Sequence, residues 1–220
     1  MTPFRDRQHG GQVLARKLAH YRGQPGLIVL ALPRGGVPVA FEVATALRAP
    51  LDVLIVRKLG YPGQEEYAMG AITSGGVRVM NRETAGMVPE EVIEAVVARE
   101  QAELVRREQL YRGQRPALAL ENRTVILVDD GLATGSSMRA AVMAVKRSKP
   151  ARTVVAVPVA ALETCESMRS EVDELVCAMA PLAFHAVGLW YRDFPQTADE
   201  EVQALLKAAW QMSATTGRQR

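Results

Sequence analysis

Several short stretches of this sequence are apolar almost without interruption, and each reads as a buried strand. They are 26–32 (GLIVLAL), 51–58 (LDVLIVRK), 124–129 (TVILVD), 152–160 (RTVVAVPVA) and 173–179 (DELVCAM). A strand that is apolar on both faces is buried on both faces, which is typical of a parallel sheet covered by helices on each side. The pattern therefore predicts an α/β fold with a mainly parallel sheet flanked by helices.

Segments of helical character separate these strands. The clearest spans 89–111, where a proline stands at the first position, an apolar stripe repeats at helical spacing, and oppositely charged side chains lie four residues apart. Other helices are expected over 10–21, 37–48, the stretch that ends near Ser148, the segment between the last two strands, and 201–212. We expect a single domain over residues 1–212, followed by a frayed tail over 213–220.

One segment fits neither pattern. Residues 59–76 (LGYPGQEEYAMGAITSGG) are rich in glycine and polar side chains, and a short strand over 76–80 follows them. Long excursions of this kind in compact domains are usually functional or mobile. We therefore expect 59–76 to form a flexible, functional loop.

Composition argues against several classes of protein. The chain has 220 residues, 48% of them hydrophobic, and a net charge of only +3, which is not typical of a nucleic-acid-binding protein. No apolar segment reaches the roughly 20 residues that a membrane span needs, and the charged N-terminus lacks an apolar signal region. Cys165 and Cys177 are expected to be reduced thiols of a cytoplasmic protein, and neither the cysteines nor the histidines have the spacing of a metal site.

The stretch TVILVDDGLATGSSMRAAV, residues 124–142, carries most of the chemical information. A predicted strand ends on Asp129 and Asp130, and a loop of small residues then leads into a helix. Such a loop exposes backbone N–H groups at the positive end of the helix dipole, which suits a phosphate; the hydroxyl donors available there are Thr134, Ser136 and Ser137. Ionised carboxylates only accept hydrogen bonds, so the acid pair would face a diol or a bound cation. A ribose 5-phosphate group meets both requirements.

Other phosphate motifs and simpler explanations fit this stretch less well. Neither G-x-x-x-x-G-K-[ST] nor G-x-G-x-x-G occurs in the chain. A solvated acid pair before a Ser-rich helix cap, or a phosphoacceptor aspartate of the receiver type, accounts for only part of the order of residues. Ligands of parallel sheets bind beyond the carboxyl ends of the strands, and the loops at 33–36, 57–75 and 129–137 all follow predicted strands.

At this point the sequence resembles a known family. VILVDDGLATGSS (125–137) is similar to the thirteen-residue signature with which type I phosphoribosyltransferases bind 5-phosphoribosyl 1-pyrophosphate (PRPP). LPRGGVPVA (32–40) resembles the pyrophosphate loop of that family, and VRKLGYPG (56–63) resembles the start of the catalytic loop of adenine phosphoribosyltransferases. VGLWYRDFP (187–195) loosely resembles the hood of hypoxanthine-type enzymes. The set covers roughly residues 10–195, and it looks most like bacterial phosphoribosyltransferases whose acceptor is undefined.

The resemblance implies an Mg²⁺-dependent enzyme that moves the 5-phosphoribosyl group between PRPP and a nucleobase or similar small nitrogen acceptor, with release of pyrophosphate. Asp129 and Asp130 would bind the ribose hydroxyls, directly or through Mg²⁺. The 5-phosphate would lie against Ala133, Thr134, Gly135, Ser136 and Ser137, and the pyrophosphate against Arg34, Gly35 and Gly36. In this family the pyrophosphate loop often contains a cis peptide bond that does not precede proline.

The resemblance also implies a lid and a hood. Arg57 and Lys58 would approach the leaving pyrophosphate when the lid, residues 59–76, closes, and together with the acid pair they are the expected catalytic residues. Within the hood, residues 181–198, the aromatic side chains that either stack on the acceptor or belong to the core are Phe184, Trp190 and Tyr191.

One position departs from the family pattern. Ala133 stands where 6-oxopurine enzymes have an aspartate, proposed as the general base, and this lowers the expectation that hypoxanthine or guanine is the acceptor. A base would then come from Glu65, Glu66 or the pyrophosphate itself. The alternative to an enzyme is a regulatory protein of the same fold that senses PRPP without turnover. Family analogy favours a homodimer, and nucleic acid is not expected as a partner because basic residues alternate with acidic ones along 89–111.

Overall fold

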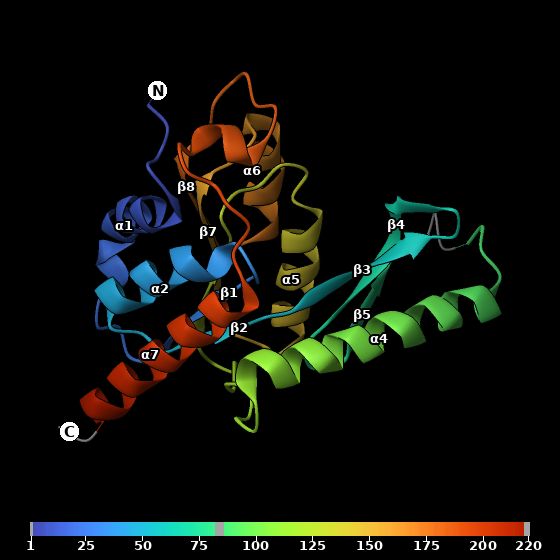
Figure 1. Ribbon diagram of the computed structural model, residues 1–220, viewed down its shortest axis with the longest axis horizontal. Coiled ribbons are helices and arrows are strands. Elements are labelled where there is room, and N and C mark those ends of the chain that lie inside the picture. Colours follow the sequence, from blue (N-terminus) through green and yellow to red (C-terminus); the bar gives the residue numbers. More distant parts are fainter. Residues whose placement is uncertain (1, 82–85, 218–220) are drawn as a thin grey trace.

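The computed structural model describes residues 2–81 and 86–217, and its centre is a five-stranded parallel sheet (Figure 1). The strands lie in the order β2-β1-β6-β7-β8, and their bounds are Leu51–Val53, Leu27–Ala31, Thr124–Val128, Arg152–Val159 and Glu174–Met179. Every pair of neighbours in this sheet is parallel. The predicted α/β fold with a mainly parallel sheet is therefore confirmed.

Helices cover both faces of the sheet. One face packs against α1 (Arg7–Lys17), α2 (Gly36–Leu47) and α7 (Asp199–Gly217), and the other against α5 (Ser136–Arg147) and α6 (Leu162–Met168). Successive strand residues alternate between the two cores: Ile126 faces the first and Leu127 the second. Because both cores exclude water, most positions of these strands must be apolar, which explains the nearly uninterrupted runs in the sequence.

The second apolar run is not one strand, as the pattern predicted. Its first part, β2, joins the parallel sheet, whereas β3 (Val56–Tyr61) belongs to a separate antiparallel sheet of order β3-β4-β5. The chain changes sheets between Leu54, whose N–H donates to the carbonyl of Ala31, and Ile55, whose N–H donates to Ser74 Oγ. Both residues are buried, so the hydrophobic pattern runs on through the break and conceals it.

The segment expected to be a flexible loop, 59–76, is a β-hairpin and part of the turn that follows it. Strand β4 (Gln64–Thr73) pairs with β3 and with β5 (Val77–Met80), and its glycines have defined roles. Gly63, Gly75 and Gly76 adopt positive φ in the two turns. A Cβ atom on Gly70 would lie 2.5 Å from the carbonyl oxygen of Val79 on the next strand. The glycine content therefore reflects tight turns and close strand packing rather than a loop.

Helix α4 (Glu90–Arg112) runs along this small sheet and extends with it away from the body of the molecule (Figure 1). It confirms the helix predicted over 89–111. Two ion pairs anchor it: Glu100 binds Arg57 of β3, and Arg112 binds Asp52 of β2.

The C-terminal helix is longer than predicted. Residues 213–217 continue α7 rather than forming a tail, and 218–220 lie outside the described residues. Residues 2–81 and 86–217 also contain 3₁₀ helices at Ala19–Tyr21 (η1), Arg169–Glu171 (η2) and Val187–Trp190 (η3).

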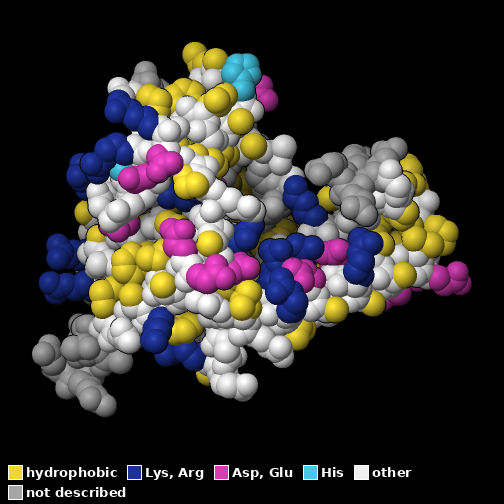
Figure 2. Space-filling model, viewed as in Figure 1, with side chains coloured by type: hydrophobic (Ala, Val, Ile, Leu, Met, Phe, Trp, Pro, Cys, Tyr) yellow, Lys and Arg dark blue, Asp and Glu magenta, His cyan; other side chains and the backbone are white. Residues whose placement is uncertain are grey.

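Charges of both signs share the surface. Figure 2 shows Lys and Arg side chains beside Asp and Glu side chains across the face that carries α4 and α7. Along α4 they form ion pairs, Glu103 with Arg106 and Arg107 among them. No helix in the described part of the chain has the length and apolar character to cross a membrane.

Candidate active site

The loops after β1 and β6 meet at one edge of the sheet. The two strands are parallel neighbours with Ala31 opposite Val128, so their carboxyl ends coincide. The N–H of Leu32 donates to the carbonyl of Val128 at 2.9 Å and brings loop 33–36 alongside the acid pair at 129–130. The peptide bond between Pro33 and Arg34 in this loop is cis.

Two consecutive glycines allow this close approach. A Cβ atom on Gly35 would lie 2.0 Å from Oδ2 and 2.7 Å from Cγ of Asp130. One on Gly36 would lie 2.8 Å from the carbonyl oxygen of Val128 and 3.0 Å from Cα of Asp129. Both positions are too close to their neighbours for any other residue type, so the Gly-Gly pair is a packing requirement between loop 33–36 and the acids.

Two helices begin at this edge. Helix α2 starts at Gly36 and α5 at Ser136, the N-cap residue of each is a glycine, and neither first turn contains an acidic residue. The N–H of Ser136 donates to Thr134 Oγ1 at 3.4 Å. The positive ends of both helix dipoles are therefore directed toward the same region, where they favour anions.

The acid pair carries an electrostatic cost in the absence of a ligand. Burial raises the pKa of Asp129 well above its usual range, and the negative charge of Asp130 raises it further. Burial also raises the pKa of Asp130, while its hydrogen bond from Arg7 works in the opposite direction. Asp129 Oδ1 accepts the N–H of Asp130 at 2.8 Å. Two adjacent half-buried carboxylates repel each other when both are ionised. A bound cation, or hydrogen-bond donors of a ligand, would stabilise their charged forms.

The sequence analysis missed one residue that touches this pair. Arg7, the first residue of α1, donates from Nε to Asp130 Oδ2 at 2.8 Å, although 123 positions separate the two. A lone arginine at the start of a short helix carries no distinguishing pattern. The available signal was the pair Gly10–Gly11 three residues later, since two glycines inside a helix indicate that another element approaches closely.

The loop at 133–137 is shaped by α6. Gly135 has φ 73°, and a Cβ atom there would lie 2.9 Å from Thr164 Cγ2. The hydroxyl of Thr164 donates to the carbonyl of Ala133. Arg139 binds the carbonyl of Thr134 at 2.7 Å and also binds residues of η2 and α6, namely Glu171 and Ser167. The loop is thus fixed by contacts with α6 and with Arg139. Ala133, Thr134 and Ser136 remain exposed, and Ser137 is half-buried.

The structure separates the arginines proposed to bind pyrophosphate. Arg34 lies in the loop beside the acid pair, with Nη1 3.8 Å from Oδ1 of Asp199 at the start of α7. Arg57 instead lies on β3, where Nη2 is 2.6 Å from Glu100 Oε2. Lys58 is exposed, and the side chains of Glu65 and Glu66 lie outside the described residues.

The three hood aromatics differ in their surroundings. Tyr191 is only 5% exposed, packs against Phe4, and donates its hydroxyl to the carbonyl of Asp130 at 2.5 Å. It is therefore a core residue that supports the acid pair, and its ring is not free to stack on an acceptor as the hood resemblance had allowed. Phe184 and Trp190 are half-buried and pack against the same cluster.

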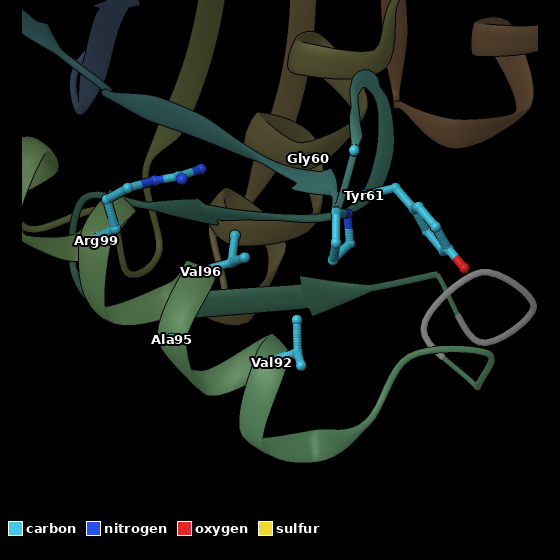
Figure 3. A pocket seen from close by; sticks show the side chains of 8 residues that line it. Gly60, Tyr61, Val92, Ala95, Val96 and Arg99 are labelled. Atoms are coloured by element: carbon cyan, nitrogen blue, oxygen red, sulfur yellow. The ribbon is translucent and has the colours of Figure 1, made fainter.

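A pocket of about 240 Å³ lies elsewhere, between the hairpin and α4. Figure 3 shows Val92, Val96 and Arg99 of α4 facing Gly60 and Tyr61 of β3. None of the residues expected to bind PRPP lines it. The candidate site lies instead at the carboxyl ends of β1 and β6.

The raised pKa of Asp129 leads to a prediction about stability. A carboxyl group whose pKa is higher in the folded than in the unfolded chain destabilises the fold progressively as pH rises from the ordinary carboxyl range through the folded-state value. Asp129→Asn removes this cost, so the variant should unfold at a higher temperature than the wild type at pH 7 and at nearly the same temperature near pH 4. Thermal unfolding without divalent cations measures the difference. A lower melting temperature for Asp129→Asn than for the wild type at pH 7 would contradict the prediction. Asp130→Asn also loses the ion pair with Arg7, so its melting temperature at pH 7 should rise less.

Comparison with known proteins agrees with this geometry. The profile of the phosphoribosyl transferase domain matches residues 7–179. Two Mycobacterium tuberculosis proteins named as phosphoribosyl transferases, MT0597 and Rv0571c, are each 43% identical over 219 residues, which make up 99% of this chain and 49% of each relative. The chain thus spans about half the length of the curated relatives it matches. The crystal structure of TT1426 from Thermus thermophilus superposes with a TM-score of 0.83 at 45% identity, covering 94% of this chain and 98% of that one. This chain belongs to the phosphoribosyl transferase domain family.

Proposed function

We propose that this chain is an Mg²⁺-dependent phosphoribosyltransferase that transfers the 5-phosphoribosyl group between PRPP and a nucleobase or another small nitrogen acceptor. The observation that carries the proposal is the convergence of an acid pair, two helix N-termini and a Gly-Gly loop at the carboxyl ends of β1 and β6. This arrangement matches a ligand with a diol between two anionic groups.

Each part of the site then has a role. Asp129 and Asp130 accept hydrogen bonds from the ribose hydroxyls. Residues 133–137 bind the 5-phosphate through backbone N–H groups and hydroxyls at the start of α5, with Ser137 at the edge of the loop. The loop formed by Arg34, Gly35 and Gly36 binds the pyrophosphate at the start of α2 through backbone N–H groups and a guanidinium group. Negative charge develops on the leaving pyrophosphate during displacement, and Arg34 and the α2 dipole stabilise that charge.

The acid pair also fits a divalent cation of the magnesium type. Mg²⁺ prefers oxygen ligands and is commonly held by one or two carboxylates together with substrate phosphates and water. Within the described part of the chain no group of three or more His, Cys, Asp or Glu side chains could hold a metal ion. In this proposal Asp129 and Asp130 would hold the ion together with PRPP oxygens. Bound Mg²⁺ supplies additional positive charge against the leaving group.

Of Arg57 and Lys58, the two basic residues that precede the proposed lid, Lys58 is the better placed to act. Arg57 would have to leave Glu100, whose side chain is only 10% exposed, before it could reach a ligand. Removing an arginine from a buried carboxylate is costly. Lys58 is exposed on the same strand and has no such obstacle. We therefore assign the structural role to Arg57 and the pyrophosphate contact to Lys58.

Calorimetric titration of PRPP with Mg²⁺ tests the proposal. We expect the wild type to bind, the double variant Asp129→Asn/Asp130→Asn to lose binding, and Glu121→Gln, an exposed acid outside the site, to bind as the wild type does. A screen of nitrogen acceptors with release of pyrophosphate as readout then measures turnover. A folded wild type that does not bind PRPP would refute the proposal, and binding without turnover on any acceptor would favour the PRPP-sensing alternative.

A further inference from the structure

One guanidinium group joins three parts of the molecule at the acid pair. Arg7 of α1 donates from Nε to Asp130 Oδ2 at 2.8 Å and from Nη1 to the carbonyl of Pro195 at 2.6 Å, and its Cζ lies 3.7 Å from the ring centroid of Phe194. We call these four residues the Arg7 clasp. Its two charged side chains are only 12% and 16% exposed, so the ion pair is shielded from the screening that weakens surface pairs.

The packing of α1 fixes the position of Arg7. Asp6 caps the helix by accepting the N–H of His9 at 2.7 Å. A Cβ atom on Gly11 would lie 2.7 Å from the carbonyl oxygen of Val39 in α2, and one on Gly10 would lie 3.1 Å from Pro158 Cγ. Because α1 lies this close to its neighbours, its first residue cannot move away from the acid pair without displacing the helix.

The segment before α1 is joined to the hood as well. Phe4 donates its N–H to the carbonyl of Trp190 and accepts the N–H of Arg192, both at 2.8 Å. The ring of Tyr191 stacks on Phe194, with centroids 4.9 Å apart, and Phe194 in turn lies under Arg7. The N-terminal segment, the hood and the acid pair are thus one connected unit.

The same carboxylate oxygen of Asp130 also meets the loop proposed to bind pyrophosphate. The Cβ position of Gly35 lies 2.0 Å from Asp130 Oδ2 and 3.2 Å from Arg7 Nε. Oδ2 of Asp130 therefore contacts both Arg7 and the loop at Gly35, and rotation of the carboxylate would break the ion pair with Arg7.

We propose that Arg7 is a positioning residue for the ribose site: it sets the orientation of Asp130 toward the sugar hydroxyls and fixes the hood to the acid pair. This inference rests on the proposed function, because it assigns a role within the PRPP site. It requires the planar guanidinium group, since one side chain must reach Asp130 and Pro195 and cover the ring of Phe194 at once. A lysine offers a single ammonium group in place of that fork.

Binding of ribose 5-phosphate with Mg²⁺ tests the inference by calorimetry. Arg7→Met keeps the apolar stem over Phe194 and removes the donors and the charge, and Arg7→Lys keeps the charge alone. Both should weaken binding about tenfold or more, the size of effect typical when a side chain that orients a ligand-binding carboxylate is lost. Arg5→Met is the matched control, because Arg5 is an exposed arginine of the same segment, and its affinity should equal that of the wild type.

A double-mutant cycle separates positioning from a general structural effect. If Arg7 acts through Asp130, then adding Arg7→Met to Asp130→Asn should cause little further loss, whereas independent effects add in full. Unchanged affinity in Arg7→Met, full affinity in Arg7→Lys, or additive losses would each overturn the inference while leaving the proposed function intact. Failure of the wild type to bind both PRPP and ribose 5-phosphate would instead refute the proposed function, and the role of Arg7 with it.

Discussion

Replacing Gly35 by alanine is expected to lower the affinity for PRPP by about a hundredfold while the protein remains folded. The added methyl group would lie 2.0 Å from Asp130 Oδ2, far inside contact distance, so either loop 33–36 or the carboxylate must shift. A misplacement of about 1 Å at a reacting centre costs roughly a hundredfold in rate, and we expect a loss of similar size in affinity because loop 33–36 and the carboxylate of Asp130 are proposed to bind the same ligand. Displacing either one would therefore remove part of the ligand's contacts.

The control for this variant is Gly23→Ala. Gly23 has φ 72° with no atom within 4 Å of its Cβ position, and it lies in the turn before β1, at the opposite end of that strand. Alanine there strains the backbone by roughly 1 kcal/mol and should lower the melting temperature without changing the affinity for PRPP. Calorimetry and thermal unfolding measure both quantities. Wild-type affinity in Gly35→Ala would show that the loop and the acid pair do not form one site.

The fold could be predicted because its main signal is local. Each strand of the central sheet is buried on both faces, so a run of apolar residues marks it. The predicted ends of these strands differ from the observed ends by at most one residue, except in the run over 51–58. That exception has a physical cause. Leu54 and Ile55, on the two sides of the break between the sheets, are both buried, and the hydrophobicity of a residue does not indicate which sheet it joins. The hairpin at 59–76 was missed because its glycines were interpreted as flexibility rather than as turns and close packing.

The PRPP-signature stretch, 125–137, and the loop after β1, 33–36, could be predicted to lie side by side, because the carboxyl ends of parallel strands lie at the same edge of a sheet. The family resemblance drawn from the same residues is confirmed by the profile match. Contacts that depend on the path of the chain could not be predicted. Arg7 reaches Asp130 across 123 positions, and Arg57 is held by Glu100 on another element. Periodicity and spacing describe single elements, whereas these side chains owe their roles to packing between elements.

Helix α4 shows how such packing bears on the site. Besides holding Arg57 through Glu100, it presents Tyr111, whose hydroxyl donates to Asp199 Oδ1, and Asp199 faces Arg34 of the proposed pyrophosphate loop. Burial and the hydrogen bond to Asp199 raise the pKa of Tyr111 to about 12, so this donor keeps its proton at physiological pH. The position of α4 along its axis therefore affects both the hairpin and Arg34.

That position depends on a buried ion pair at the end of the helix. Arg112 donates from Nε to Asp52 Oδ1 at 3.1 Å and from Nη2 to the carbonyl of Val53 at 2.8 Å. Asp52 is 3% exposed and also accepts the N–H groups of Val53 and Leu118. Loss of Asp52 leaves the buried Arg112 with Glu108, 3.1 Å away and half-buried, as its remaining counter-charge. Breaking a buried pair typically costs about 3–5 kcal/mol, more than a surface pair contributes.

Asp52→Ala is accordingly expected to destabilise the protein by about 3–5 kcal/mol and to lower its melting temperature by about 10 °C or more. Glu103→Ala is the matched control, because it removes a carboxylate that pairs with Arg106 and Arg107 of α4 but whose side chain is 28% exposed. It should lower the free energy of unfolding by less than about 1 kcal/mol. The double variant Asp52→Ala/Arg112→Met removes both buried charges and should recover much of the loss, because the penalty comes from the uncompensated guanidinium group rather than from the absent pair. Denaturant unfolding of the four proteins measures these differences. Equal losses for Asp52→Ala and Glu103→Ala would mean that Arg112 finds sufficient compensation in Glu108, 3.1 Å away, and that α4 does not depend on β2 for its position.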